Sequence, residues 1–149
     1  MRTFSQVPIR LWRDKAFRAL SVDGKFAVLS LWCGPHSTSA GILNCEDGFG
    51  ALVLDWTVER WQAARAEIEA RGLARWSRDT DEVWLPDFFT TNKPSNAAAR
   101  AAVSRQIAAI ESKELREAAA RAFQTVIPAT DGDGTPSRLQ TPYLTGQRR

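Results

Sequence analysis

The sequence is poor in the residues on which metal and catalytic sites usually depend. Its 149 residues include two cysteines and a single histidine. Cys33, His36 and Cys45 offer three ligands at irregular spacing, whereas a structural zinc site needs four. A catalytic histidine needs positioned partners, and beside His36 only Cys33 offers a nucleophile, with no third group to orient the pair. We therefore interpret both cysteines as reduced, buried side chains and expect no metal site.

Nucleotide-binding motifs and long apolar runs are also missing. The chain contains no P-loop, no Gly-x-Ser-x-Gly turn and no dinucleotide fingerprint. No run approaches the roughly eighteen apolar residues of a membrane helix, and residues 1–6 lack the apolar stretch of a signal peptide. Asp79, Asp81 and Glu82 form a carboxylate cluster, but at a position where a hairpin is expected to turn. These absences predict a cytoplasmic protein with no enzymatic activity, no cofactor and no membrane contact.

Tryptophan, by contrast, is frequent. All six tryptophans fall within the first ninety residues: Trp12, Trp32, Trp56, Trp61, Trp76 and Trp84. Large aromatic side chains contribute much of the apolar area that a core buries. We therefore expect the core in this part of the chain, and a length of 149 residues fits one domain with appendages.

Residues 48–89 carry the clearest structural pattern. They predict a short helix from Phe49 to Leu54, a tight turn at residues 55–57 and a second helix from Val58 to Arg71. A hairpin follows, with strands at residues 73–78 and 82–86 that turn at Asp79-Thr80-Asp81. This order predicts a mainly α fold with a small β-hairpin, a winged helix-turn-helix, whose ligand is nucleic acid or a partner protein.

The second helix has start, face and stop signals. Thr57 is a candidate N-cap, and Trp61, Ala64 and Ile68 recur at the spacing of one buried helix face. Gly72 can adopt the left-handed conformation that ends many helices.

The opposite face of this helix and the hairpin supply the candidate DNA-binding residues. These are Thr57, Arg60, Gln62, Ala63, Arg75 and Arg78. The small Ala63 allows close approach to a groove, Arg60 and Gln62 can reach base edges or phosphates, and the hairpin arginines suit phosphates. Two alternatives stay open: the helix residues are simply solvated, and Arg78 pairs across the hairpin with Glu82.

Before this stretch, the pattern predicts two helices and a strand. Trp12, Phe17 and Leu20 indicate a helix over residues 13–20, and Ser21 is a candidate N-cap for a helix that runs through Lys25 to Cys33. The second of these helices is apolar nearly all round, which is typical of a helix at the centre of a domain. Residues 41–44 predict a strand that pairs with the hairpin.

After residue 94 the composition becomes rich in alanine. Apolar residues recur at helical spacing until the phase slips at residues 111–113, which predicts two helices or one kinked helix. Because alanine buries little area, we interpret residues 95–127 as a weakly anchored arm, free to move or to form a homodimer. Residues 128–149 are expected to be a disordered tail, in which Tyr143-Leu144 is a candidate docking motif. The predicted winged helix-turn-helix domain covers residues 1–94.

The charge distribution divides the chain. Residues 1–45 carry six basic and two acidic side chains, a net charge of +4, whereas residues 46–94 carry six basic and ten acidic ones, a net charge of −4. Neutralisation of phosphates dominates most nucleic-acid affinities. Either the basic N-terminal segment supplies phosphate contacts to the module, or the module binds protein.

Several stretches are similar to a known family. They are Ile9-Arg10-Leu11-Trp12-Arg13-Asp14, Phe17-Arg18-Ala19-Leu20-Ser21, the segment from Leu31 to Thr38, Gly41-Ile42-Leu43, Gly72-Leu73, the segment from Val83 to Phe89, and the connector Asn92, Pro94 and Asn96. Over residues 7–125 the chain resembles small phage and prophage winged-helix proteins that are grouped with phage replication initiators, or replisome organisers. The resemblance implies binding of double-stranded DNA at a replication origin and recruitment of a helicase or its loader by the C-terminal part. The alternative from another class is an adaptor of the replisome that binds protein alone, or a transcriptional regulator without catalytic activity.

Overall fold

The computed structural model describes residues 4–35 and 37–127. Its elements are, in chain order, the 3-10 helix η1 (Ile9–Arg13), α1 (Lys15–Arg18), α2 (Val22–Cys33), β1 (Ile42–Asn44), α3 (Asp47–Val53), α4 (Val58–Ala70), β2 (Arg75–Trp76), β3 (Glu82–Trp84), α5 (Phe88–Thr91), α6 (Ala97–Ala108) and α7 (Lys113–Val126). The described part is mainly helical with one small antiparallel sheet, as the sequence predicts at this coarse level. His36 and the predicted tail, with Tyr143-Leu144, lie outside the described residues.

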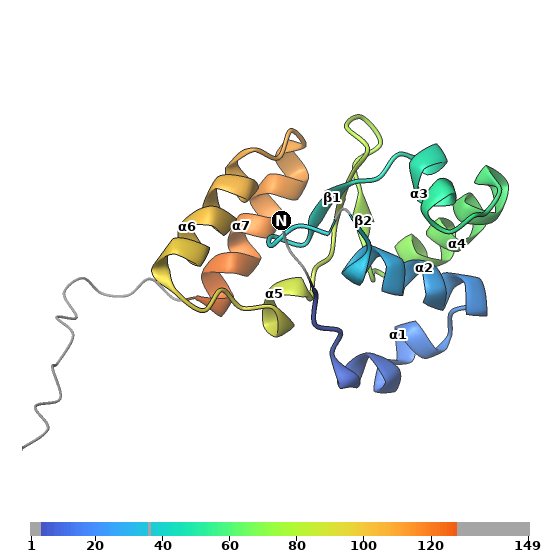
Figure 1. Cartoon of the computed structure of the whole chain (residues 1–149), viewed down its shortest axis with the longest axis horizontal. Coiled ribbons are helices and arrows are strands. Elements are labelled where there is room, and N and C mark those ends of the chain that lie inside the picture. The colour runs from blue at the N-terminus through green and yellow to red at the C-terminus, as the bar shows by residue number, and fades with distance from the viewer. Residues whose placement is uncertain (1–3, 36, 128–149) are drawn as a thin grey trace, which may run out of the picture.

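The sheet lies between two groups of helices. Its three strands run in the order β1-β3-β2, which confirms the predicted pairing of residues 41–44 with the hairpin. Figure 1 shows α6 and α7 on one side of the sheet and α2, α3 and α4 on the other. The sheet therefore separates the two ends of the molecule.

The register assigns side chains to the two faces of the sheet. Trp84 pairs with Ile42 on one side and with Arg75 on the other, so these three side chains share a face. Val83 pairs with Trp76 on the opposite face. The Trp76 ring lies 5.1 Å from the Arg65 guanidinium of α4, so the Val83 face points toward α4 and the Trp84 face points toward the arm.

The helix α4 begins and ends where the local signals predict. The Thr57 side chain accepts a hydrogen bond from the backbone N–H of Arg60 at 3.3 Å and caps α4. Trp61 and Ile68 are almost fully buried. Gly72, with a φ of +69°, has the left-handed conformation expected at the end of the helix.

The helix predicted over residues 13–20 forms but is shorter than predicted: α1 covers only Lys15–Arg18, because the chain leaves helical geometry at Asp14. The Asp14 carboxylate accepts a hydrogen bond from the backbone N–H of Phe17 at 2.9 Å. This N-cap starts the short α1 and separates it from η1, since capping residues favour non-helical backbone at their own position. Ser21 caps α2 as predicted.

Two predictions of burial around α2 are wrong. Phe26 is 53 % exposed and Val22 is 81 % exposed, so the helix is buried on one side only. Cys33, predicted to be buried, is exposed at the end of this helix, whereas Cys45 is buried. The described elements cover the sides of α2 that face α4 and the sheet and leave its outer side open.

The arm packs more closely than its alanine content suggests. The phase slip at residues 111–113 separates α6 from α7, which confirms the two-helix alternative. Val103 of α6 and Leu115 of α7 are almost fully buried. The Phe89 and Phe123 rings lie 5.2 Å apart and join α7 to the segment after the sheet. The expectation of a weakly anchored arm is therefore wrong.

Candidate nucleic-acid interface

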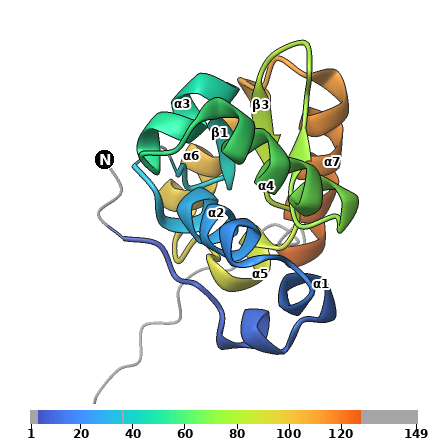
Figure 2. The same cartoon turned by 90° about the vertical axis from the view of Figure 1, so that its right-hand side faces the viewer.

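The candidate site begins where α3 turns into α4. Asp55, with a φ of +53°, makes the turn, and the capped first turn of α4 follows at once. The two helices pack closely, because a Cβ at Gly50 would lie only 2.4 Å from the Trp61 indole. Figure 2 shows α4 on the same side of the molecule as α2, with the hairpin above them.

Arg60 is held by an acidic partner on another helix. Its Nε and Nη2 atoms donate to the two carboxylate oxygens of Asp23 at 2.7 and 2.8 Å. The guanidinium also lies 4.3 Å from the centre of the Trp56 ring. The hydrogen bond from Arg60 holds the pKa of the Asp23 carboxyl below its ordinary value. Arg60 still exposes 51 % of its side chain, but a phosphate or base would have to compete with Asp23 for it.

Gln62 and Arg65 converge on a second carboxylate, that of Asp47 at the start of α3. Gln62 Nε2 donates to Asp47 at 3.0 Å, Arg65 Nη1 at 2.7 Å and the Trp61 indole N–H at 3.1 Å. Burial alone would raise the pKa of Asp47, but these hydrogen bonds outweigh burial and lower it. The cluster joins α3 to α4 and uses the Gln62 amide that was predicted to contact DNA.

The remaining outer face of α4 is small and carries no cation. Besides Arg60, the exposed residues of α4 are Val58, Glu59, Gln62, Ala63, Ala66 and Ala70. Ala63 thus lies where the sequence predicts, on the solvent side. Such a face permits close approach of a groove or of another protein, but it supplies no positive charge of its own.

The two hairpin arginines point to different places. Arg75 shares a sheet face with Trp84, and its guanidinium lies 5.6 Å from the centre of that ring, on the side of the arm. Arg78 is exposed at the hairpin turn and has no ion pair within the described residues. Arg75 therefore does not lie on the same surface as the outer face of α4. Arg78 lies at the hairpin turn.

The predicted alternative, in which Arg78 pairs with Glu82, does not form. Glu82 is 9 % exposed, and its carboxylate accepts hydrogen bonds from the backbone N–H groups of Glu111 and Ser112 at 2.9 and 2.8 Å. It also accepts a hydrogen bond from the Thr80 hydroxyl at 2.8 Å. Glu82 therefore holds the start of α7 against the sheet.

The cysteines give no site of their own. Burial, and next the negative charge of Asp47, raises the pKa of the Cys45 thiol to about 11, so this thiol stays protonated at neutral pH. The Cys33 thiol donates to the Leu29 carbonyl at 3.0 Å. Within residues 4–35 and 37–127 no group of three or more side chains could hold a metal ion. Over the same residues, no helix combines the length and apolar character that a membrane crossing requires.

Sequence reasoning missed the two carboxylates that control the site. Asp23 and Asp47 lie 37 and 18 residues from the arginines that they bind. Each lies in the first turn of a helix, where acidic residues are common because they interact favourably with the helix dipole. The sequence alone therefore gives no reason to pair these carboxylates with Arg60 and Arg65. The pairing follows from the way the helices pack against one another in the structure.

Comparisons with known proteins add no relative to this description. No family model, no curated protein and no solved structure matches the chain.

Proposed function

We propose that residues 22–84 form a winged helix-turn-helix module that binds double-stranded DNA. The order α2, β1, α3, α4, β2, β3 and the strand order β1-β3-β2 support this proposal. The observation that carries it is the outer face of α4, which is exposed, lined by alanine and followed at once by a hairpin. A recognition helix lies in the major groove and therefore needs an exposed face.

In this proposal the contacts to DNA are fewer than the sequence alone suggests. Ala63 and Gln62 would face the groove, and Arg78 at the hairpin tip would contact a phosphate. Arg71, exposed at the end of α4, would contact another. A role in phage replication initiation, with a helicase or its loader as partner, rests on the family resemblance.

The test is fluorescence anisotropy of the protein with labelled duplex DNA at several salt concentrations. We expect log affinity to fall linearly with log salt, since each phosphate contact releases counterions. The double variant Arg71→Glu with Arg78→Glu should weaken binding at least about tenfold, while Arg105→Glu with Arg121→Glu on the arm changes the net charge equally and should have little effect. Equal losses in both variants would contradict a specific face.

A second candidate function is that of a protein-binding adaptor. Residues 46–94 carry a net charge of −4, and the arginines of α4 are paired with carboxylates. Phe26 and Trp56 lie 6.1 Å apart on the outer side of α2 and at the α3–α4 turn, and Phe26 is half exposed. An adaptor would show no affinity for duplex DNA, and Phe26→Ser would reduce partner binding while Arg78→Glu would not.

A further inference from the structure

The basic N-terminal segment does not join the α4 and hairpin surface. In Figures 1 and 2 α1 lies at one end of the molecule and the hairpin turn at the other. Leu73, which follows α4, lines a groove with Leu11 of η1, so the segment contacts the end of α4 rather than its outer face. The positive charge of the N-terminal segment therefore belongs to a second surface.

The 3-10 geometry of η1 sorts its side chains into two ridges. Residues three apart align in a 3-10 helix, so Ile9 and Trp12 form an apolar ridge, and Arg10 and Arg13 form a parallel basic one. Ile9 is 80 % exposed and Trp12 is 57 % exposed. This exposed apolar ridge lies directly beside the arginine ridge of the same short helix.

Trp12 is held in place without being covered. Its ring meets the buried Phe17 ring edge to face, with centroids 5.3 Å apart and planes at 87°. Phe17 itself is fully buried. The indole is therefore oriented by the core and still offers most of its surface to a ligand.

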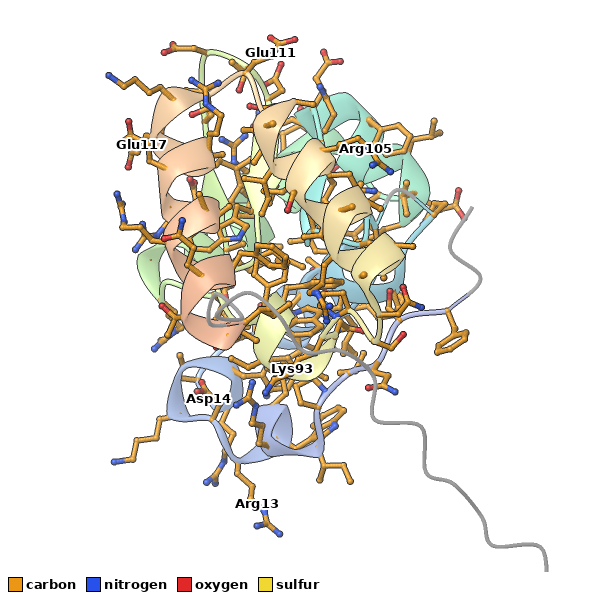
Figure 3. All side chains as sticks on the ribbon, turned by 90° about the vertical axis from the view of Figure 1, so that its left-hand side faces the viewer. Arg13, Asp14, Lys93, Arg105, Glu111 and Glu117 are labelled. Carbon is orange, nitrogen blue, oxygen red and sulfur yellow. The ribbon has the colours of Figure 1, made fainter. Side chains whose placement is uncertain are left out.

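The cations around Trp12 are available, unlike those of α4. Arg10 donates to the hydroxyl groups of Thr90 and Thr91, which are neutral and leave its charge uncompensated. Arg13, Lys15 and Arg18 are exposed and have no ion pair within the described residues. Figure 3 shows Arg13 projecting away from the lower end of the molecule.

The acidic residues nearby leave this charge in place. Asp14 caps α1, and together with Asp87 it lines the groove of about 250 Å³ under η1. Arg10 and Arg13 line the same groove, so its two carboxylates are matched by two arginines and the groove has no net positive charge. Residues 9–18 carry four basic side chains and one acidic side chain, a net charge of +3, and Arg13, Lys15 and Arg18 among them are exposed.

We propose that the surface formed by Ile9, Trp12, Arg13, Lys15 and Arg18 binds single-stranded nucleic acid. An exposed aromatic ring flanked by cations is the combination that such sites use, since bases stack on the ring and the backbone follows the charges. A lipid surface would need a longer apolar face than the two side chains of one short helix. This site is independent of the duplex contact proposed above and lies at the other end of the molecule.

The experiment is anisotropy of the full chain with labelled oligothymidine, with labelled duplex DNA measured in parallel. Trp12→Ala should weaken oligothymidine binding about tenfold, the effect of losing one stacked base, whereas Trp12→Phe should keep most of the affinity. Arg13→Glu with Arg18→Glu should weaken it further and lower the slope of log affinity against log salt. The matched control, Arg105→Glu with Arg121→Glu, changes the net charge equally on α6 and α7 and should leave binding nearly unchanged.

Three results would overturn the proposal: no binding of oligothymidine by the wild-type chain, equal losses in the two charge-reversed variants, or binding of anionic lipid vesicles in place of oligothymidine. If Trp12→Ala does not fold, the charge-reversed pair decides, because neither of its arginines belongs to the core. If the wild-type chain binds oligothymidine but not duplex DNA, only the duplex binding proposed above is overturned.

Discussion

Whether the positive charge of an arginine in this protein is available to a ligand depends on whether a carboxylate is paired with it. Arg60 carries its positive charge at the start of α4, but Asp23 accepts two hydrogen bonds from it. A polyanion that approaches α4 meets a neutral pair. Removal of the carboxylate should therefore expose a cation at the place where the first turn of a recognition helix meets DNA.

We expect Asp23→Asn to strengthen duplex binding several-fold, because Arg60 would be released and one negative charge lost. The measurement is the duplex titration at fixed salt. Glu117→Gln removes one exposed negative charge on α7 and controls for the change in net charge. If both variants bind equally well, release of Arg60 contributes nothing, and α4 does not contact the duplex.

The carboxylate of Asp47 makes a prediction about pH. Its pKa is lowered in the folded protein, so its contribution to stability is present above the ordinary value of 3.8 and is lost as the pH falls through the lower folded value. Asp47→Asn should lower the free energy of unfolding by about 1–2 kcal/mol at neutral pH, since the hydrogen bonds involve charged groups but are partly exposed.

The measurement is chemical denaturation of wild type and Asp47→Asn from about pH 6 down to about pH 2. The difference between the two proteins should shrink as the wild-type carboxyl becomes protonated. A difference that stays constant across this range would assign the loss to the shape of the side chain rather than to its charge.

At the scale of elements, the contact between α3 and α4 depends on a missing side chain. A Cβ at Gly50 would meet the Trp61 ring at 2.4 Å, whereas one at Gly48 would meet nothing within 4 Å. Gly50→Ala should therefore destabilise the protein by about 1–3 kcal/mol through overpacking. Gly48→Ala, in the same helix, should be neutral or stabilise it by up to about 1 kcal/mol, because alanine favours helix. Thermal denaturation of the two variants measures both changes in stability. Equal shifts of the melting temperature would contradict the close packing of α3 against α4.

The junction of sheet and arm depends on Glu82. This carboxylate accepts hydrogen bonds from two backbone N–H groups at the start of α7, where the helix dipole also favours a negative charge. Glu82→Gln should lower the free energy of unfolding by about 1.5–3 kcal/mol. It should also increase the rate of amide hydrogen exchange in α7.

The matched control is Glu114→Gln, in the exposed first turn of the same helix. This variant loses only the interaction with the helix dipole, so we expect its free energy of unfolding to fall by at most about 1 kcal/mol. If the two variants lose the same stability, the hydrogen bonds of Glu82 are not what holds α7.

Sequence reasoning succeeds here where the deciding contacts are local. The start of α4 at Thr57, its end before Gly72 and the turn at Asp79-Thr80-Asp81 each follow from residues within one turn of the feature. The helix predicted over residues 13–20 is shorter in the structure, because Asp14 caps α1 and excludes the residues before it, which the spacing of apolar side chains does not indicate.

The exposure of some candidate residues was predictable from the sequence, but their ion pairs were not. The sequence identifies α4 and the hairpin as the exposed elements, and Ala63 and Arg78 lie on the surface as expected. Whether an arginine is free depends on partners from other helices, such as Asp23 for Arg60. Sequence patterns of single elements do not contain that information.

At the scale of the whole molecule, the two helical groups share one sheet. Ile42 and Trp84 line the face that points to the arm and are both largely buried. Phe89 meets Phe123 of α7. The boundary predicted at residue 94 therefore crosses a continuous core, which includes residues from both sides of it.

We expect a fragment of residues 1–94 to lose cooperative unfolding. Removal of α6 and α7 exposes the Trp84 face of the sheet and removes the backbone N–H groups that donate hydrogen bonds to Glu82. A fragment of residues 1–127 should unfold cooperatively with the midpoint of the full chain, since it keeps every described contact. Urea denaturation followed by circular dichroism compares the two fragments. If residues 1–94 unfold cooperatively with nearly the stability of the longer fragment, the arm is a separate unit, and Glu82→Gln should then affect α7 alone.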